Sequence, residues 1–277
     1  MSKPTQSYFK SHDHHRLYYE TWGHDKPRGT LIFVHGLNEH SGRYAHVADY
    51  FQKRDYNVYL FDHRGHGKSD GLRSFADDFS HYLKDVDEFV HLVFKTERDH
   101  KVFLVGHSMG GQIVLNYLAK YRSRLSGFVT FSPNILTVLK IPFLKKWIGL
   151  KLACFMPKFS VVNEIDCRFI SHDPKVVEAY ENDPLVSKKI TLGLAKELYE
   201  NQKDILKLAY RIHIPALMMH GSGDQICHVD GSKKFFRRLA SEDKTLKIFE
   251  GFYHELFNEP EKNQVLKFME DWLAKRT

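Results

Sequence analysis

The chain contains only three cysteines among its 277 residues, and no two of them form a C-x-x-C pair. This scarcity argues against a disulfide framework and favours a reducing, cytoplasmic compartment. The amino-terminal segment lacks the apolar stretch that a secretory signal needs, so we expect none. The longest stretch without a charged residue, 102–119, is interrupted by a Gly-His-Ser-Met-Gly-Gly turn, and we expect no membrane span there.

The charge balance is basic, with a formal net charge of +7 at pH 7. This excess predicts attraction to anionic surfaces. No nucleic-acid-binding motif accompanies it, so we expect no nucleic acid among the partners. A hydrophobic fraction of 42% and a charged fraction of 27% are typical of a globular protein with a sizeable core.

Histidine is abundant, with 18 residues, and raises the question of a metal site. His12, His14 and His15 form the densest group. The sequence offers no second ligand cluster at a spacing typical of zinc sites. We therefore interpret this segment as a solvated surface and expect neither a bound metal nor a cofactor.

Apolar runs of strand length alternate with helical patterns along most of the chain, which predicts parallel βαβ units. Most of the runs are continuously apolar, as expected for strands that helices cover on both faces. The sequence therefore predicts an α/β fold with a mostly parallel sheet flanked by helices. Strands are expected at residues 17–21, 31–34, 58–61, 102–105, 128–131, 216–219 and 246–249, and helices at 79–95, 112–121, 232–239 and 260–275.

The alternation stops within residues 134–210, which are mostly of helical character. A connection of this length needs its own structure or its own function. Ligands bind at the carboxyl ends of the strands in open α/β sheets, and an insertion there would cover the site. We interpret residues 134–210 as a cap (lid) domain, and residues 1–133 and 211–277 as the core domain.

The most informative motif is Gly106-His107-Ser108-Met109-Gly110, which follows an apolar run and precedes a helical pattern. The G-x-S-x-G pattern is typical of a nucleophile elbow, a sharp strand-to-helix turn that lifts a serine hydroxyl above the sheet edge. Glycines fit two residues before and after the serine because the crowded turn leaves no room for a Cβ. The sequence therefore predicts a serine hydrolase with Ser108 as its nucleophile.

A serine nucleophile needs a histidine to accept its proton and a carboxylate to orient that histidine. Asp224 and His254 each follow an expected strand, in the order serine, acid, histidine that α/β hydrolases use. Their loops can therefore reach the sheet edge that carries Ser108. We predict that these three residues form the catalytic triad.

Each of these roles has a rival nearby in the sequence. Asp230 lies further along the loop than Asp224, where we expect it at the start of the following helix. His220 is expected to pack at a strand end. His107 is expected to be a buried, hydrogen-bonded histidine that points away from Ser108.

Acyl transfer also needs hydrogen-bond donors for the oxyanion that develops on the substrate carbonyl. The backbone amide of the residue after the nucleophile, Met109, supplies one donor. The second donor comes from the loop after the strand at 31–34, and we predict the amide of Leu37. The side chains of both residues are expected at the mouth of the pocket.

Several longer segments carry a resemblance to a known family. They are residues 35–44 (HGLNEHSGRY), 62–71 (DHRGHGKSDG), the elbow, 182–185 (NDPL) and 243–251 (DKTLKIFEG). With these segments the chain resembles, nearly end to end, the monoacylglycerol lipase and lysophospholipase-like family of the α/β-hydrolase superfamily. The resemblance implies the same triad and oxyanion hole as above.

The same resemblance implies roles around the triad. Glu39 and Arg43 match positions near the glycerol end of the substrate, and a loop-stabilising ion pair is the alternative of equal weight. Cys227 matches a thiol near the site, which we interpret as a packing residue. Phe257 departs from the pattern, because some members have a second histidine there, close to the glycerol.

Residues 135–159 of the expected cap are apolar and basic, contain Trp147, and include no acidic residue. A segment of this composition can lie at a bilayer interface with lysine side chains reaching the head groups. Pro142 argues against one continuous helix. We expect peripheral contact with a membrane or lipid aggregate; the alternative is that the apolar residues only face the acyl pocket below. The lysines are Lys140, Lys145, Lys146, Lys151 and Lys158.

The leading hypothesis is a cofactor-free serine carboxylester hydrolase that cleaves monoacylglycerol to glycerol and fatty acid through an acyl-enzyme on Ser108. The closest alternative is a lysophospholipase or a broad short-chain carboxylesterase with the same triad. Cleavage of a small peptide or amide, and a non-catalytic ligand receptor on a hydrolase fold, also stay open. Dehalogenase chemistry is disfavoured because it requires an aspartate at position 108.

Overall fold

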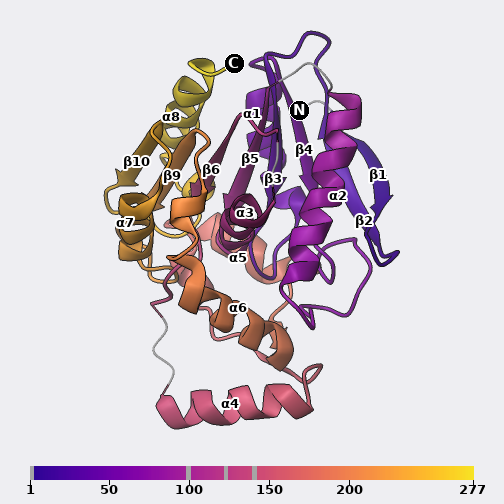
Figure 1. The fold of residues 1–277 in the computed structure, drawn as a ribbon, viewed down its shortest axis with the longest axis vertical. Helices are drawn as coiled ribbons and strands as arrows, with labels where there is room; N and C mark the ends of the chain where they lie inside the picture. Colours follow the sequence, from indigo (N-terminus) through magenta and orange to yellow (C-terminus); the bar gives the residue numbers. More distant parts are fainter. Residues whose placement is uncertain (1–2, 98–100, 122–123, 139–141) are drawn as a thin grey trace.

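The computed structural model describes residues 3–97, 101–121, 124–138 and 142–277. Its centre is an eight-stranded sheet with the strand order β1-β2-β4-β3-β5-β6-β9-β10 (Figure 1). β2 is antiparallel to β1 and to β4, and the other neighbouring strands are parallel, which confirms the predicted fold class. The strands are β1 (Thr5–Lys10), β2 (Arg16–Trp22), β3 (Gly29–Val34), β4 (Tyr56–Phe61), β5 (Val102–His107), β6 (Gly127–Phe131), β9 (Ala216–Gly221) and β10 (Lys244–Phe249).

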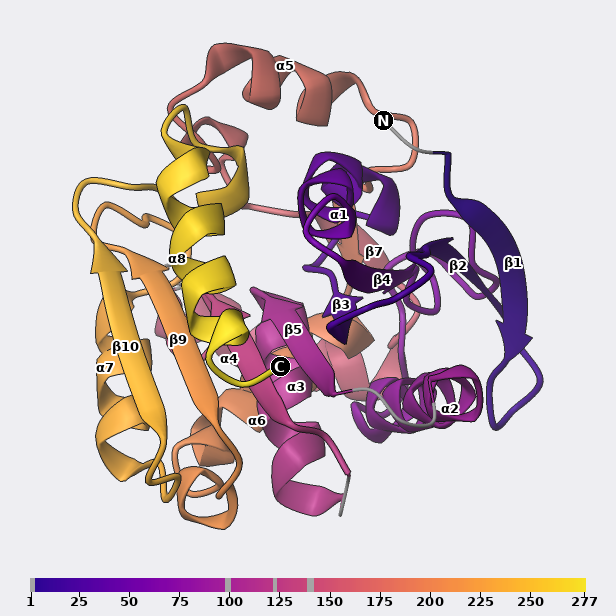
Figure 2. The same cartoon turned by 90° about the horizontal axis from the view of Figure 1, so that it is seen from above.

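Helices cover both faces of this sheet (Figure 2). α1 (Ala45–Gln52) and α8 (Lys262–Ala274) pack on one face, and α2 (Ser80–Thr96), α3 (Met109–Lys120) and α7 (Val229–Arg238) pack on the other. Successive residues of a strand enter opposite cores because side chains alternate across a sheet. In β3, for example, Ile32 and Val34 join one core, whereas Leu31 and Phe33 join the other.

The strands and helices that the sequence predicts for the sheet and its cover are all present, with small shifts at their ends. The apolar pattern does not predict β1, in which Phe9 alone is buried. It also does not predict α1, an eight-residue helix. An exposed edge strand and a short helix both lack the long apolar period on which such a prediction depends.

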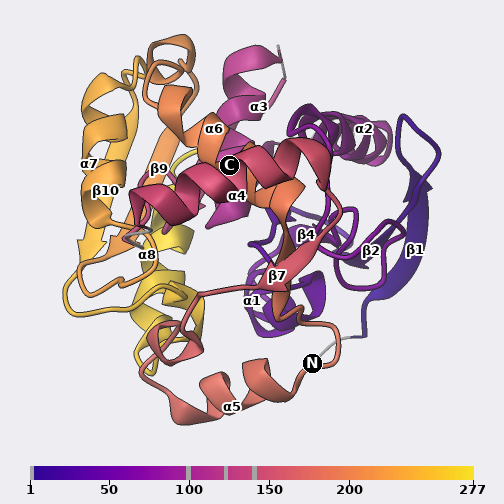
Figure 3. The same cartoon turned by 90° about the horizontal axis from the view of Figure 1, so that it is seen from below.

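Residues 134–210 lie between β6 and β9, at the end of the sheet where the parallel strands finish (Figure 1). Seen from that end, α4 crosses the sheet and α5 lies to one side (Figure 3). The segment is mostly helical, as predicted, and α4 begins directly after Pro142. It comprises α4 (Phe143–Phe155), β7 (Ser160–Val162), η2 (Cys167–Phe169), α5 (Pro174–Asn182), β8 (Lys189–Thr191), α6 (Leu192–Ile205) and η3 (Ala209–Arg211).

Polar contacts hold part of this insertion against loops of the sheet. His40 Nε2 lies 2.9 Å from Asp183 Oδ2. The Ser187 amide donates to the Asn38 carbonyl at 3.0 Å. Thr191 Oγ1 donates to a backbone carbonyl of the loop after β4 at 2.6 Å. In the described part of the chain, no helix has both the length and the apolar character needed to cross a bilayer.

Candidate active site

Ser108 stands in the sharp turn between β5 and α3, with φ 51° and ψ −117°. Such a backbone conformation is strained for any residue with a side chain and costs about 1–3 kcal/mol. The turn is held by hydrogen bonds to the Ser108 carbonyl from the amides of Gln112 at 3.0 Å and Asn134 at 2.9 Å. This is the strand–turn–helix context that the motif predicts.

The two glycines of the motif are required by close backbone approaches. A Cβ on Gly106 would lie 2.6 Å from the Gly110 carbonyl oxygen, and a Cβ on Gly110 would collide with the Val34 carbonyl of β3. Because both obstacles are backbone atoms, no side-chain rotation relieves them. The glycines therefore let α3 approach the end of the sheet closely enough to present Ser108.

Asp224 and His254 meet behind this turn. His254 Nδ1 lies 2.8 Å from Asp224 Oδ2, and both residues are buried. A carboxylate only accepts hydrogen bonds, so Nδ1 carries the proton and Nε2 keeps a lone pair. The other carboxylate oxygen of Asp224 accepts from the amides of Ile226 at 2.8 Å and Cys227 at 2.9 Å.

The pKa values of this pair move in opposite directions. Burial alone would raise the pKa of Asp224. The charge of His254 and the hydrogen bonds from His220 and His254 outweigh burial and lower this pKa far below its usual range. Burial alone would lower the pKa of His254, but the Asp224 carboxylate outweighs it and raises that pKa. The pair therefore stabilises the imidazolium that a proton transfer to His254 would create.

Ser108 and His254 line one small cavity of about 30 Å³. Among the contacts of the described residues, no hydrogen bond joins Ser108 to the His254 ring. Ligand-free sites often lack this contact, which tightens when substrate binds. Burial raises the pKa of Cys227, so its thiol stays protonated and packs as expected.

The two residues expected to supply the oxyanion donors lie on different elements. Leu37 follows β3 and lines the cavity. Met109 is the first residue of α3, where backbone amides have no partner within the helix. Its side chain, however, is fully buried in the core, so the expectation that it lines the pocket mouth is wrong.

Glu39 and Arg43 form an ion pair, with Arg43 Nη1 2.9 Å from Glu39 Oε2. The same guanidinium makes two hydrogen bonds to Glu255, of 2.6 and 2.7 Å. Burial alone would lower the pKa of Arg43, but Glu255 and Glu39 outweigh it and raise that pKa. Glu39 and Glu255 line the cavity, and the Arg43 guanidinium lies 4.7 Å from the ring centroid of Tyr180, another lining residue.

Glu39 also fixes the loop that carries Leu37. Its Oε1 accepts from the Gly36 amide at 2.7 Å and the Tyr44 hydroxyl at 2.7 Å, and it lies 2.8 Å from His107 Nδ1. His107 is therefore buried and hydrogen-bonded, as predicted. It nevertheless lines the cavity beside Ser108, so the expectation that it points away is not supported.

Sequence reasoning missed Glu255 as a site residue, although it directly follows His254 in the chain. It also assigned His220 to packing alone. His220 is fully buried at the end of β9, and its Nε2 lies 3.1 Å from Asp224 Oδ2. The signal in the sequence is the four-residue spacing of His220 and Asp224 across the end of a strand.

The remaining expectations concern residues outside the triad. Asp230 lies in the first turn of α7, as expected, and its side chain is half exposed. Phe257 is buried and packs on Phe131 with ring centroids 4.4 Å apart, so it belongs to the core. Of the histidine-rich segment, His12 is partly exposed and contacts His81 of α2.

The Arg43 network generates a stability prediction. We expect Arg43→Met to lower the free energy of unfolding by about 3–5 kcal/mol, because it leaves two buried carboxylates without their partner. Equilibrium unfolding in urea measures the loss. The matched control is Arg168→Met, which removes an exposed pair with Asp166 and should leave the unfolding midpoint unchanged. Equal losses of unfolding free energy in both variants would contradict the role of Arg43 as the partner of two buried carboxylates.

Comparison with known proteins places this geometry in a family. Residues 25–261 match the family model described as serine aminopeptidase, S33. The chain is 37% identical to a monoacylglycerol lipase of Mycolicibacterium smegmatis over 94% of this chain and 93% of that protein. It is 37% identical, over 91% of its length, to an uncharacterized abhydrolase domain-containing protein of Dictyostelium discoideum, and covers 27% of that longer protein.

A solved structure agrees with the sequence relatives. The crystal structure of Paleococcus ferrophilus monoacylglycerol lipase superposes with a TM-score of 0.86 at 33% identity, covering 94% of this chain and 99% of that one. The match extends over the sheet, its helices and the insertion alike. The chain therefore belongs to the same family of α/β hydrolases as these lipases and is a carboxylic ester hydrolase.

Proposed function

We propose that this protein cleaves monoacylglycerol to glycerol and free fatty acid through an acyl-enzyme on Ser108. The observation that carries the proposal is the strained Ser108 turn, which shares one cavity with His254 while Asp224 holds the far side of the imidazole. The two similar monoacylglycerol lipases support the substrate class.

The mechanism follows from the proposed roles. Ser108 Oγ attacks the ester carbonyl carbon while His254 Nε2 takes its proton, and Asp224 stabilises the resulting imidazolium. The amides of Leu37 and Met109 donate to the oxyanion of the tetrahedral intermediate. His254 then returns the proton to the departing glycerol oxygen, which leaves the acyl group on Ser108.

The second half repeats the first with water as the nucleophile. His254 removes a proton from water, and the resulting oxygen attacks the acyl carbon of the ester on Ser108. Collapse of this second intermediate breaks the bond to Ser108 Oγ, which regains its proton from His254. The products are the free fatty acid and the regenerated enzyme.

The cavity lining supports a neutral polyol as the head group. The lining includes the carboxylates of Glu39 and Glu255 together with His107, and the guanidinium of Arg43 faces both carboxylates. Two negative charges against one positive charge disfavour a phosphate beside these carboxylates. Monoacylglycerol therefore fits better than a lysophospholipid.

We propose that residues 134–210 act as the cap over this site and that α4 contacts a membrane or lipid aggregate. Ile165, Ile170 and Tyr180 of this segment line the cavity. Along α4 and just beyond it, large apolar side chains face solvent: Trp147, Ile148, Leu152, Phe155, Met156 and Phe159. Spacings of three, four and seven residues place Ile148, Leu152 and Phe155 on one helical face.

Lysines accompany this apolar face. Lys151 and Lys158 are exposed, and Lys151 Nζ lies 5.9 Å from the Trp147 ring. Lys140 and the side chains of Lys145 and Lys146 lie outside the described residues. The combination of an apolar face with basic side chains is typical of helices that lie at an anionic lipid interface.

The substrate assignment is tested by turnover of a medium-chain monoacylglycerol beside a lysophosphatidylcholine with the same acyl chain. We expect strong preference for the monoacylglycerol, and we expect Ser108→Ala to lower kcat by about 10⁴-fold or more, since it removes the nucleophile. The unfolding midpoint of Ser108→Ala serves as the control for folding. Comparable turnover of both lipids would contradict the head-group assignment, and turnover that survives in the variant would contradict Ser108.

The raised pKa of His254 predicts the pH dependence of kcat/KM. His254 must be neutral to accept the proton, so activity falls as pH falls through its pKa. We expect the midpoint of this acid limb above pH 6.5, the ordinary pKa of a histidine. Asp224→Asn should move the limb to lower pH and lower kcat by about 10⁴-fold. Asp230→Asn is the matched control; a shifted limb in that variant would contradict the assignment.

The apolar face of α4 predicts a dependence on lipid surfaces. We expect Ile148→Asp combined with Phe155→Asp to weaken binding to phosphatidylcholine–phosphatidylglycerol vesicles about tenfold or more, since it removes two large apolar contacts. Sedimentation with vesicles measures binding, and a water-soluble short-chain ester should be hydrolysed at the normal rate. Tyr210→Ser, at an exposed residue of η3, is the control. Unchanged vesicle binding in the double variant would overturn the proposal.

A further inference from the structure

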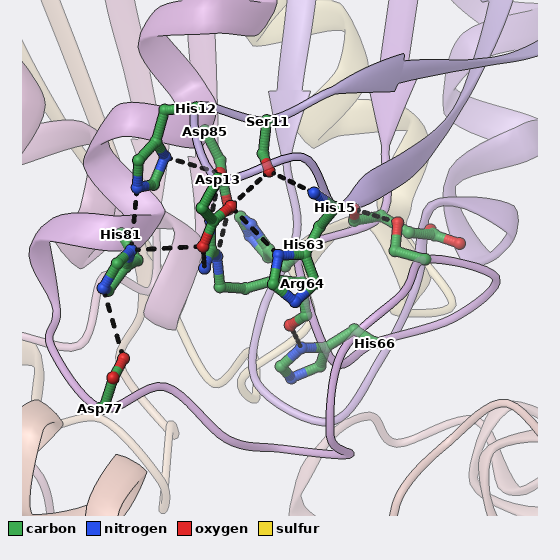
Figure 4. Close-up of polar contacts among 12 residues, drawn as sticks. Ser11, His12, Asp13, His15, His63, Arg64, His66, Asp77, His81 and Asp85 are labelled. Atoms are coloured by element: carbon green, nitrogen blue, oxygen red, sulfur yellow. Dashed lines mark hydrogen bonds and ion pairs between the residues drawn. The ribbon is translucent and has the colours of Figure 1, made fainter.

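The turn between β1 and β2 meets the amino-terminal end of α2 in a cluster of histidines and carboxylates (Figure 4). His12 Nε2 lies 3.0 Å from His81 Nδ1, although the two residues are 69 positions apart. His81 Nδ1 lies 3.8 Å from Asp13 Oδ2. One donor atom from each of these three residues falls within 4.8 Å of the other two.

A carboxylate lies on the outer side of each ring. His81 Nε2 faces Asp77 Oδ1 at 3.3 Å. His12 Nδ1 is buried, has no hydrogen-bond partner, and faces Asp85 Oδ1 at 3.8 Å. Protons on these two nitrogens point N–H groups at carboxylates, an arrangement typical of histidines that bind metals.

With those tautomers, the lone pairs of His12 Nε2 and His81 Nδ1 face each other across 3.0 Å. A cation between the two nitrogens stabilises this arrangement; in its absence, a proton on one of them forms an N–H···N hydrogen bond. The alternative tautomer of His12 would place a hydrogen on Nε2 and aim the bare, buried Nδ1 at the Asp85 carboxylate. That arrangement leaves a lone pair facing a negative charge.

The charges around the cluster also favour a cation. Asp13, Asp77 and Asp85 supply three negative charges, and Arg64 supplies one positive charge. Arg64 holds Asp85 through two hydrogen bonds of 2.7 Å and holds Asp13 at 2.8 and 3.1 Å (Figure 4). A divalent ion would balance the excess of two negative charges.

We propose that His12, Asp13 and His81 bind a divalent transition-metal ion of the zinc type. Two imidazole nitrogens and one carboxylate oxygen are donors that zinc accepts, whereas calcium and magnesium prefer oxygen donors alone. Zinc–nitrogen distances of about 2.0–2.1 Å place two nitrogens about 3.3 Å apart in a tetrahedral site, so the rings need to separate only slightly. Water would occupy the fourth position.

The site is accessible and separate from the cavity of Ser108. The side chains of His12 and His81 are each 23% exposed, and that of Asp13 is 30% exposed, so an ion can enter from solvent. None of the three lines the catalytic cavity. A bound ion would tie the β1–β2 turn to α2 and stabilise the folded chain. Sequence spacing could not show this, because His81 comes from a distant helix.

Thermal unfolding with and without Zn²⁺ tests the proposal on protein first stripped with a chelator. We expect Zn²⁺ at about 100 times its Kd to raise Tm by about 5 °C, because it binds the folded state alone. Mg²⁺ and Ca²⁺ should give no shift. His12→Ala and His81→Ala should each lose the Zn²⁺ shift.

The matched control is His91→Ala. His91 also lies on α2, and its Nδ1 is 3.6 Å from Oδ2 of Asp87, four residues earlier. His81 has the same four-residue spacing from Asp77. Because no second imidazole contacts His91 among the described residues, we expect the Zn²⁺ shift to persist in this variant. Zinc shifts of wild-type size in His12→Ala and His81→Ala would show that the ion binds elsewhere and would overturn the proposal.

Isothermal titration of the wild-type chain gives a second readout that does not depend on any variant folding. We expect one high-affinity Zn²⁺ equivalent, weakened at least tenfold by His81→Ala. Absence of a one-to-one event in the wild-type chain would overturn the site. Hydrolysis by the metal-free chain should match that of the loaded chain, so loss of the metal site is distinguishable from loss of the proposed function.

Discussion

The strained turn at Ser108 is the constraint on which the rest of the site depends. A backbone at φ 51° persists only where the surrounding structure holds it. The first ten residues of α3 are all buried, and Gly106 and Gly110 allow the helix to press against the ends of β5 and β3. Packing of α3 in the core on its face of the sheet therefore supplies the free energy that keeps the serine raised above the sheet.

A second set of buried groups connects two loops around that turn. Glu39 holds the loop after β3, Arg43 links it to Glu255, and Glu255 is bonded to His254 along the chain. Buried charges of this kind contribute little net stability, since desolvation offsets their attraction. Their consequence is positional: the loop that carries Leu37 and the loop that carries His254 cannot shift independently.

The sequence predicts the sheet, the elbow and the triad because each rests on a local pattern. Apolar runs mark the strands, and Asp224 and His254 directly follow two of them. Contacts between distant segments have no such pattern. Arg43 and Glu255 are 212 residues apart, and His12 and His81 are 69 apart. Met109 shows a different limit, because the motif gives its amide a role but does not say which way its side chain points.

The attachment of the insertion divides it into two parts with different mechanical properties. Asp183, Ser187 and Thr191 are hydrogen-bonded to the loops after β3 and β4, next to Leu37. This part is coupled to the polar end of the cavity. α4, in contrast, packs on α6 and exposes an apolar face. Under the proposed function, movement of α4 at a lipid surface would therefore leave the loop of Leu37 in place, and the proposed steps of substrate entry and oxyanion stabilisation would depend on separate parts of the insertion.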